Sequence, residues 1–247
     1  MTLTAFSLAG HTILITGASS GIGRTISIRA SQMGARVVLL GRDMTRLDET
    51  LAMLDGKDHL SVSMDLLKLH EIESALTPLL KSTGPLHGFV HSAGMAPTVL
   101  LRDLDTDRTE YLMRLNWLSF MALSQAICRR GRYAPGLSVV ALASISALTG
   151  QVGLSAYAGT KGALIASVRS LASEYAPRGI RFNCISPCPV DTPMQRETRS
   201  RLGEEWYRKE VLEKARLGPL APEDVADPVL FQVRRSEERR VGKECRS

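Results

Sequence analysis

The sequence predicts an α/β fold in a single domain, in which a doubly wound parallel sheet carries helices on both faces. Short apolar and β-branched runs alternate with helical patterns along the chain, as strand-helix-strand units require. A glycine-rich turn joins the first of these runs directly to the first helical pattern. The chain has 247 residues, 44% of them hydrophobic, which is enough for one large core.

The first strand-turn-helix unit begins with HTILIT at residues 11–16 and continues with GASSGIG at 17–23. Apolar residues then recur at helical spacing up to residue 33. Glycines allow tight dihedrals and a close approach of the backbone to a pyrophosphate, and a helix N-terminus attracts anions. The candidate cofactor-binding residues of this turn are Gly17, Ser19, Ser20, Gly21, Ile22 and Gly23. A glycine loop on its own is equally typical of a plain turn.

The second predicted strand covers residues 36–41 and ends where a cofactor-binding βαβ unit places its ribose-contacting residue. NAD sites usually have a carboxylate at this point, whereas this chain has Gly41 followed by Arg42. An arginine can bind a 2′-phosphate through two hydrogen bonds, so the sequence favours NADP (NADPH) over NAD. The alternative is that Arg42 is simply solvated and Asp43 caps the next helix.

The alternation of strands and helices continues along the chain. We expect further strands near 59–65, 86–92, 137–143 and 180–186, and helices near 43–54, 68–82, 106–130 and 156–176. Ligands bind at the carboxyl ends of parallel strands. Polar or small residues at these predicted ends are Asp65, Ser92, Ala93, Gly94, Ser144 and Ser186.

The segment from Ser144 to Lys161 supplies a hydroxyl, a phenol and an ammonium group. Tyr157 and Lys161 are four residues apart, so in a helix both side chains lie on one face. The lysine charge would then lower the pKa of the phenol from its usual value of about 10, and such a phenol can transfer protons near pH 7. Ser144 follows a predicted buried strand and could hydrogen-bond a substrate oxygen. Together the three groups could act on a carbonyl or a carbinol, although Tyr-x-x-x-Lys alone is a short pattern.

Composition argues against several other classes of protein. No apolar run approaches the roughly eighteen residues of a membrane span, and the N-terminus lacks a basic signal-peptide region. We therefore expect a cytoplasmic protein with no membrane partner. The four cysteines form no C-x-x-C pair and the five histidines are scattered, so neither disulfides nor a metal site are predicted. Residues 234–247 carry six Arg or Lys against three Glu, which accounts for half of the net charge of +6 and argues against a nucleic-acid partner.

Several motifs follow one another in a fixed order along the chain: TGASSGIG at 16–23, HSAG at 91–94, Asn116, Ser144, Tyr157-x-x-x-Lys161 and ISPCPVDT at 185–192. With these motifs the chain resembles the short-chain dehydrogenase/reductase family, in particular its 3-oxoacyl-carrier-protein reductase-like group. The resemblance covers about residues 8–233 and implies a Rossmann fold and an NADPH-dependent ketoreductase. An NAD(P)-dependent alcohol or sugar dehydrogenase working oxidatively is the alternative. A dinucleotide-binding regulatory protein without turnover is an alternative of a different class.

The resemblance also implies roles for individual residues. Tyr157 would be the general acid in reduction, Lys161 would hold the nicotinamide ribose and lower the Tyr157 pKa, and Ser144 would bind the substrate oxygen. Asn116 would hold a water that links Lys161 to solvent, unless it is a plain amide inside a helix. The remaining cofactor contacts would be Asp65, Leu66, Ser92, Ala93, Gly94, Pro187, Val190 and Thr192. The substrate would be a small carbonyl or alcohol compound.

Two residues depart from the family's pattern near the expected cofactor site. Ser92 replaces the usual asparagine, so one ribose contact would be lost or shortened. Cys188 replaces a glycine, and at a positive φ it would strain the loop by about 1–3 kcal/mol. Residues 194–217 lie where the family has a substrate lid. There Met194, Leu202, Trp206 and Val211 either line an apolar pocket or rest on the core.

The C-terminus and the helix surfaces lead to expectations about assembly. Residues 1–233 form the predicted dinucleotide-binding domain, and the charged tail 234–247 looks disordered or foreign, with the family's final edge strand missing. Family members pair through helices equivalent to 106–130 and 156–176, so a homo-oligomer is expected, a dimer rather than a tetramer. The apolar residues Leu164, Val168 and Leu171 either face outward for this contact or belong to the core.

Overall fold

A six-stranded sheet with the order β3-β2-β1-β4-β5-β6 forms the centre of the computed structural model, which describes residues 7–213, 215 and 218–234. All of its strand pairs are parallel. The strands are β1 (Thr12–Thr16), β2 (Arg36–Gly41), β3 (Leu60–Ser63), β4 (Leu86–His91), β5 (Tyr133–Leu142) and β6 (Arg181–Ile185). The predicted doubly wound parallel sheet is therefore confirmed. The strand order reverses between β1 and β4, and ligands bind at such a switch point.

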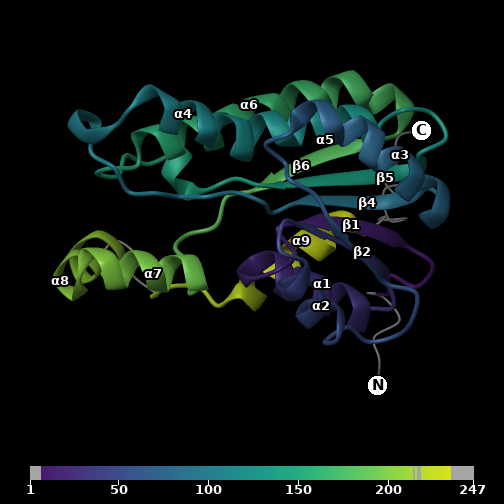
Figure 1. Cartoon of the computed structure of the whole chain (residues 1–247), viewed down its shortest axis with the longest axis horizontal. Coiled ribbons are helices and arrows are strands. Elements are labelled where there is room, and N and C mark those ends of the chain that lie inside the picture. Colours follow the sequence, from purple (N-terminus) through teal and green to yellow (C-terminus); the bar gives the residue numbers. More distant parts are fainter. Residues whose placement is uncertain (1–6, 214, 216–217, 235–247) are drawn as a thin grey trace, which may run out of the picture.

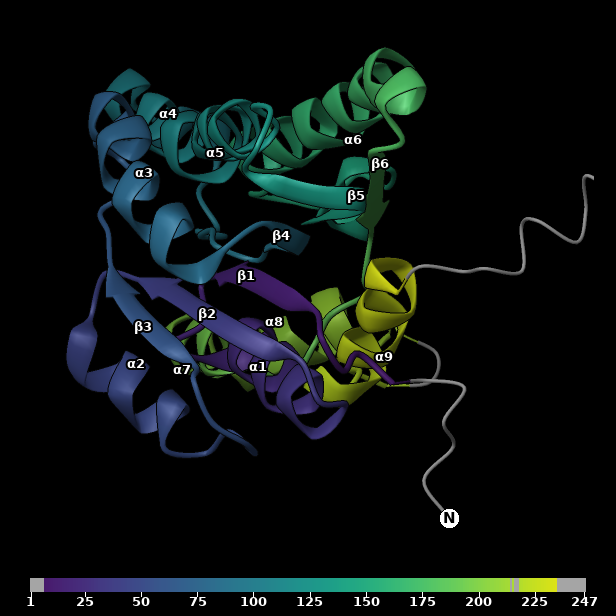
Figure 2. The same ribbon diagram turned by 90° about the vertical axis from the view of Figure 1, so that its right-hand side faces the viewer.

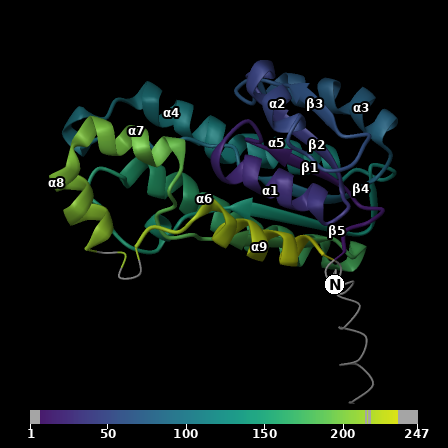
Figure 3. The same ribbon diagram turned by 90° about the horizontal axis from the view of Figure 1, so that it is seen from below.

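Helices cover both faces of this sheet (Figure 2). One layer consists of α1 (Gly21–Gln32), α2 (Met44–Leu51) and α9 (Pro222–Val233), and the other of α3 (Ile72–Thr83), α4 (Thr106–Met113), α5 (Ser119–Ile127) and α6 (Ser155–Tyr175). Two further helices, α7 (Pro193–Leu202) and α8 (Glu204–Tyr207), lie outside these layers, on the side of the molecule where α4 lies (Figures 1 and 3). They follow β6 in the chain and so project from the end of the sheet where ligands bind.

The core consists of two apolar clusters, one on each side of the sheet. Leu14 of β1 packs with Phe89 and Phe120 beneath α3, α5 and α6, whereas Ile13 and Ile15 pack beneath α1 and α9. A strand covered on both faces consists mainly of apolar residues, which is why these segments are nearly continuous apolar runs in the sequence. No helix of the described part of the chain combines the length and the apolar character that crossing a bilayer requires.

The long helix expected near 106–130 is interrupted in its middle. A π-helical turn, Arg114–Leu118, joins α4 to α5, and Asn116 lies in this turn with no exposed surface. Helical periodicity cannot reveal such a turn, because one extra residue changes the phase without ending the apolar pattern. π turns of this kind often occur at functional sites.

Two expectations about the surface of the fold can now be judged. Leu164 and Val168 are 0% and 4% exposed within the single chain, so they belong to the core and are not outward contact residues. Leu171 is half-buried. In the described part of the sheet β6 pairs with β5 on one side only. The predictions about the tail concern residues 234–247, of which 235–247 lie outside the described residues.

Candidate active site

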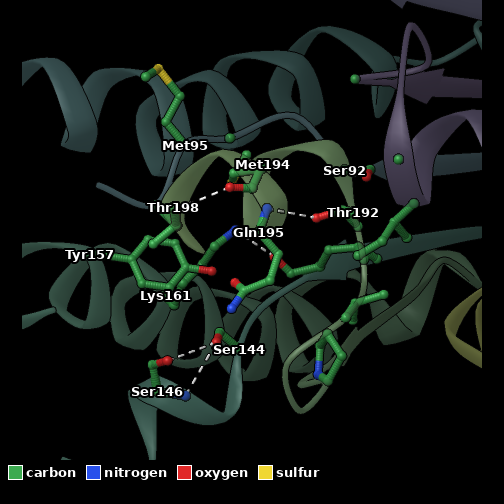
Figure 4. A pocket seen from close by; sticks show the side chains of 18 of the residues that line it. Ser92, Met95, Ser144, Ser146, Tyr157, Lys161, Thr192, Met194, Gln195 and Thr198 are labelled. Carbon is green, nitrogen blue, oxygen red and sulfur yellow. Dashed lines mark hydrogen bonds between the residues drawn. The ribbon is translucent and has the colours of Figure 1, made fainter. Parts of the chain in front are cut away.

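A cavity of about 410 Å³ opens at the carboxyl ends of the strands, between the sheet and the α7–α8 segment (Figure 4). Most of the residues singled out in the sequence line it. They are Gly17, Ser19, Ser20, Gly21, Ile22, Arg42, Leu66, Ser92, Ala93, Gly94, Ser144, Tyr157, Lys161, Pro187, Val190 and Thr192. The fold therefore brings segments from β1 to α7 to one surface, although they span more than 170 residues of sequence.

Two of the predicted cofactor residues, Gly23 and Asp65, do not line the cavity. A Cβ on Gly23 would lie 2.2 Å from the carbonyl oxygen of Gly17, so this glycine allows the turn to pack on its own helix. Asp65 accepts a hydrogen bond from the backbone N–H of Leu67 at 3.1 Å, which stabilises the turn after β3. The geometry thus gives both residues a structural role.

The glycine turn fits closely against the end of β4. Gly17 has a φ of +66°, and a Cβ there would lie 2.9 Å from the backbone nitrogen of Ala93. At the start of α1 the N-cap residue, Ser20, forms no side-chain cap hydrogen bond. The N-terminus of α1 therefore presents backbone N–H groups and a positive dipole end to the cavity, which is a suitable environment for a phosphate.

Thr16 and His91 hold this region together, and although both belong to motifs noted in the sequence, neither was given a role there. The Thr16 hydroxyl accepts hydrogen bonds from the backbone N–H groups of Ser92 and Ala93, each at 3.1 Å, and lies 3.1 Å from His91 Nδ1. Because this hydroxyl already accepts twice, its own proton is directed to Nδ1. Burial, together with the Lys161 charge, lowers the pKa of His91 to about 3, so the imidazole remains neutral. A histidine at the carboxyl end of β4 was the available signal.

Lys161 and Tyr157 both come from α6 and lie one turn apart (Figure 4). The Lys161 ammonium, 5% exposed as a residue, donates a hydrogen bond to the Leu142 carbonyl at 2.7 Å and lies 5.8 Å from the centroid of the Tyr157 ring. Burial lowers the pKa of Lys161 to about 8.

The pKa of Tyr157 is raised above its usual value, chiefly by burial, and a hydrogen bond with Ser144 acts in the opposite direction. The expectation that the pKa of Tyr157 lies below its usual value is therefore wrong for this structure. The physical reason is that removal of the phenol from water outweighs the other influences on it. The ammonium is also directed to the Leu142 carbonyl at the end of β5.

Ser144 follows β5 and is the first member of a short hydrogen-bond chain. Its Oγ donates to Ser146 Oγ at 3.1 Å and accepts from the Ser146 backbone N–H at 3.2 Å, and Ser146 Oγ donates to Gln151 Oε1 at 2.7 Å. Ser146 and Gln151 also line the cavity. Sequence reasoning did not single them out, since two polar residues in a loop carry no recognisable pattern.

Asn116 lies behind the cavity wall, where its side-chain amide is fully used. Its Oδ1 accepts from the Met95 N–H at 2.9 Å, and its Nδ2 donates to the Met95 carbonyl at 2.9 Å and to Thr160 Oγ1 at 3.0 Å. The amide thus ties the loop after β4 to α6. The π turn places this residue next to Gly94, where a Cβ would lie 3.0 Å from Asn116 Oδ1.

Comparison with known proteins identifies the family. The family model described as short chain dehydrogenase matches residues 11–203. This chain belongs to the short chain dehydrogenase family. Mouse 3-oxoacyl-(acyl-carrier-protein) reductase is 32% identical over 197 residues, 80% of this chain and 81% of the mouse protein. Bovine L-xylulose reductase is 32% identical over 227 residues, 91% of this chain and 89% of the bovine protein.

Solved structures agree with this assignment. L-Sorbose reductase from Gluconobacter frateurii, solved with NADPH and L-sorbose, superposes with a TM-score of 0.83 at 25% identity, covering 92% of this chain and 90% of that one. The chain is thus an NAD(P)-binding oxidoreductase of the short-chain type with a Rossmann fold. Among the described residues no group of three or more His, Cys, Asp or Glu side chains could hold a metal ion.

At one end of this dehydrogenase's cavity lie two arginines, Arg42 and Arg46. Both side chains are exposed, and among the described residues neither guanidinium forms an ion pair. Asp43 caps α2 by accepting from the Arg46 N–H at 3.1 Å, so its carboxylate is engaged there. Asp43 thus caps α2 while Arg42 lies at the cavity, so the helix cap does not exclude a cofactor contact by Arg42. Arg46 was missed, although an arginine one helical turn after Arg42 was the available signal.

The two departures from the family's pattern both lie on the cavity wall. Cys188 is exposed, and in the described part of the chain Asp58 is the only non-glycine residue with a positive φ. Cysteine at position 188 therefore imposes no left-handed strain, and the predicted distortion of this loop is absent. Ser92 also faces the cavity, and its backbone N–H is fixed by Thr16.

The opposite end of the cavity combines apolar side chains with the polar side chains of Gln195, Thr198 and Glu210. Met194 of α7, Trp206 of α8 and Val211 of the π-helical turn Arg208–Leu212 line it, and Leu202 does not. Val211 is only 4% exposed. Met95, Val152 and Leu154 contribute apolar surface from other segments. Residues that follow β6 therefore form one wall of a partly apolar compartment beside Tyr157.

Proposed function

We propose that this short-chain dehydrogenase is an NADPH-dependent ketoreductase that acts on apolar carbonyl compounds, with 3-oxoacyl-carrier-protein reduction as the first named activity to test. The observation that carries the proposal is one cavity with two chemically different ends. One end combines the α1 N-terminus with two guanidinium groups, and the other combines Ser144, Tyr157 and Lys161 with apolar side chains. The similarity to 3-oxoacyl-(acyl-carrier-protein) reductase supports it.

The residues present fit a dinucleotide phosphate. Gly17 and Gly21, both at positive φ, leave room for a pyrophosphate at the N-terminus of α1. Arg42 and Arg46 would hold the 2′-phosphate, and Ser92, Val190 and Thr192 would contact the remaining parts of the cofactor. NADPH supplies the hydride when it is bound.

In our proposal the side chains near the apolar end bind the substrate oxygen and transfer the proton to it. Ser144 hydrogen-bonds the carbonyl oxygen, and Tyr157 donates its phenolic proton to that oxygen as negative charge develops there. The raised pKa of Tyr157 supports the reductive direction, because the phenol is protonated at neutral pH and ready to act as an acid. Lys161 stabilises the phenolate that remains and binds the nicotinamide ribose. Asn116 ties the loop after β4 to α6 and so holds both in place beside Tyr157 and Lys161. A water relay through this residue stays a prediction.

The test of the proposed function is NADPH oxidation over a series of carbonyl compounds. We expect turnover of β-ketothioesters and alkyl ketones, with kcat/KM rising about threefold to fourfold for each added methylene until the apolar compartment is full. Ketoses, which expose hydroxyl groups to apolar walls, should react more slowly. No NADPH oxidation with any member of the series, or a preference for the ketoses, would refute this substrate assignment. NADP reduction with the matching alcohols tests the oxidative alternative.

The proposed cofactor preference leads to a second prediction. Wild-type protein should bind NADPH at least about tenfold more tightly than NADH, because charge-assisted hydrogen bonds to the 2′-phosphate contribute about 1.5–3 kcal/mol. Arg42→Ala should remove most of this difference and leave the Kd of NADH within about twofold. Fluorescence titration measures both constants. Arg102→Ala, which removes an exposed arginine outside the cavity, is the matched control. Equal wild-type affinities for the two cofactors would contradict the assignment.

Assembly, location and domain limits remain proposals from the sequence. We propose a dimer that uses the exposed surface of α4, α5 and α6, without Leu164 and Val168, since these are buried within the subunit. A monomer in light scattering at micromolar concentration would contradict it. A cytoplasmic location, and a dinucleotide-binding domain that spans residues 1–233, also stay predictions.

A further inference from the structure

The hydrogen-bond chain from Ser144 through Ser146 to Gln151 lies along the cavity wall. Ser144 and Ser146 are 8% and 7% exposed, and Gln151 is half-buried. Figure 4 shows Ser144 and Ser146 joined by two hydrogen bonds beneath Tyr157. The chain ends on the side-chain amide of Gln151, at a distance of 2.7 Å from Ser146 Oγ. Nothing else in the proposed mechanism uses this amide.

The direction of this chain matters, because a serine hydroxyl has a single proton. As the structure stands, Ser144 donates to Ser146 and Ser146 donates to Gln151 Oε1. A Ser144 hydroxyl directed in this way cannot also donate to a substrate oxygen. The proposed function requires that it does, so the chain must run in the opposite direction in the reacting complex.

A primary amide makes this reversal possible without moving the backbone. A half-turn about the last side-chain bond presents the NH₂ group of Gln151 to Ser146 instead of its oxygen. Gln151 then donates to Ser146 Oγ, Ser146 donates to Ser144 Oγ, and the Ser144 proton is directed into the cavity. A hydroxyl whose oxygen accepts hydrogen bonds is also a stronger donor than a hydroxyl whose oxygen accepts none, because each bond polarises the next.

We propose that Gln151 is a positioning residue that sets the Ser144 hydroxyl in its donating direction, acting through Ser146. This inference rests on the proposed ketoreductase function. It explains why an amide at position 151 suits the site. A carboxylate there would only accept hydrogen bonds and would hold the chain in the unproductive direction.

The decisive experiment is Gln151→Glu with a pH profile. At pH 8 the glutamate is ionised, and kcat for ketone reduction should fall by about 10- to 100-fold, part of the loss expected when an oxyanion donor is removed. As the pH falls toward 5 the carboxyl group gains a proton and can donate to Ser146. The ratio of variant to wild-type kcat should therefore rise by about twofold or more at pH 5. Gln32→Glu, the same change at the exposed C-terminal end of α1, should leave this ratio constant.

A second variant separates action through Ser146 from direct contact of Gln151 with substrate. In a Ser146→Ala background the chain is broken, so adding Gln151→Glu should change kcat by less than about twofold. Three results would each overturn the inference. These are an equal loss of kcat in both backgrounds, a loss of kcat that does not depend on pH, and no loss of kcat at pH 8. NADPH affinity and the unfolding temperature of each variant show whether the fold is intact.

Failure of this inference can be distinguished from failure of the proposed function. If wild-type protein reduces ketones and Tyr157→Phe does not, the ketoreductase assignment stands whatever Gln151→Glu does. If wild-type protein reduces none of the ketones, the proposed function fails, and the inference about Gln151 fails with it.

Discussion

Tyr157→Phe should lower kcat for ketone reduction by at least about 100-fold, with the Kd of NADPH within about twofold of wild type. The substitution removes the phenolic oxygen and keeps the ring, so packing in α6 and the shape of the cavity are preserved. The oxygen that is lost is the proposed proton donor, whose raised pKa keeps it protonated at neutral pH. Steady-state kinetics at saturating NADPH, together with fluorescence titration of the cofactor, measure the two effects separately.

A matched control is available at the end of the same helix. Tyr175 packs against Phe182 and does not line the cavity, so Tyr175→Phe should leave kcat within about twofold of wild type. If Tyr157→Phe also retained kcat within a few-fold, proton donation would have to come from another group. The proposed mechanism would then be wrong.

The parts of the site that the sequence predicted are those that depend on local chemistry. The glycine turn at 17–23 must adopt dihedrals that other residues avoid, and Gly17 does have a positive φ. Tyr157 and Lys161 are related by one helical turn, so their shared position on α6 follows from their spacing alone. The meeting of these segments at one cavity follows from the parallel sheet, whose strand ends lie on one side.

The parts that were missed depend on burial and on contacts between distant segments. Spacing indicates that Lys161 is near Tyr157, but the pKa of the phenol is decided by how much water the surrounding segments exclude. The Gln151–Ser146–Ser144 chain depends on a loop conformation that has no sequence signature. Leu164 and Val168 have the same apolar pattern whether they face a partner subunit or the core, and only the packing of α6 on the sheet decides between the two.

Lys161→Met should abolish most activity while making the free protein more resistant to unfolding near neutral pH. Methionine keeps the length of the side chain and removes its charge. We expect kcat/KM to fall by at least about 1,000-fold, because both the binding of the nicotinamide ribose and the stabilisation of the Tyr157 phenolate are lost. Unlike Tyr157→Phe, this variant should also bind NADPH more weakly. Unchanged affinity for NADPH would show that Lys161 does not contact the cofactor.

The effect of Lys161 on stability has a defined dependence on pH. Burial lowers its pKa to about 8 from its ordinary value of 10.5, so between these values the unfolded chain binds more protons than the folded protein. The destabilisation caused by the buried charge is complete below pH 8 and is relieved as the pH rises toward 10.5.

The free energy of unfolding of Lys161→Met minus that of wild type isolates the contribution of Lys161, because the other titrating groups contribute equally to both proteins. Lys161 is only 5% exposed, so solvent screens its charge little. The difference in the free energy of unfolding should fall by about 2 kcal/mol between pH 7 and pH 9.5. Urea denaturation of both proteins without cofactor at several pH values measures it. A difference that stays constant over this range would mean that Lys161 has an ordinary pKa, and that the buried ammonium is stabilised by more than its bond to the Leu142 carbonyl.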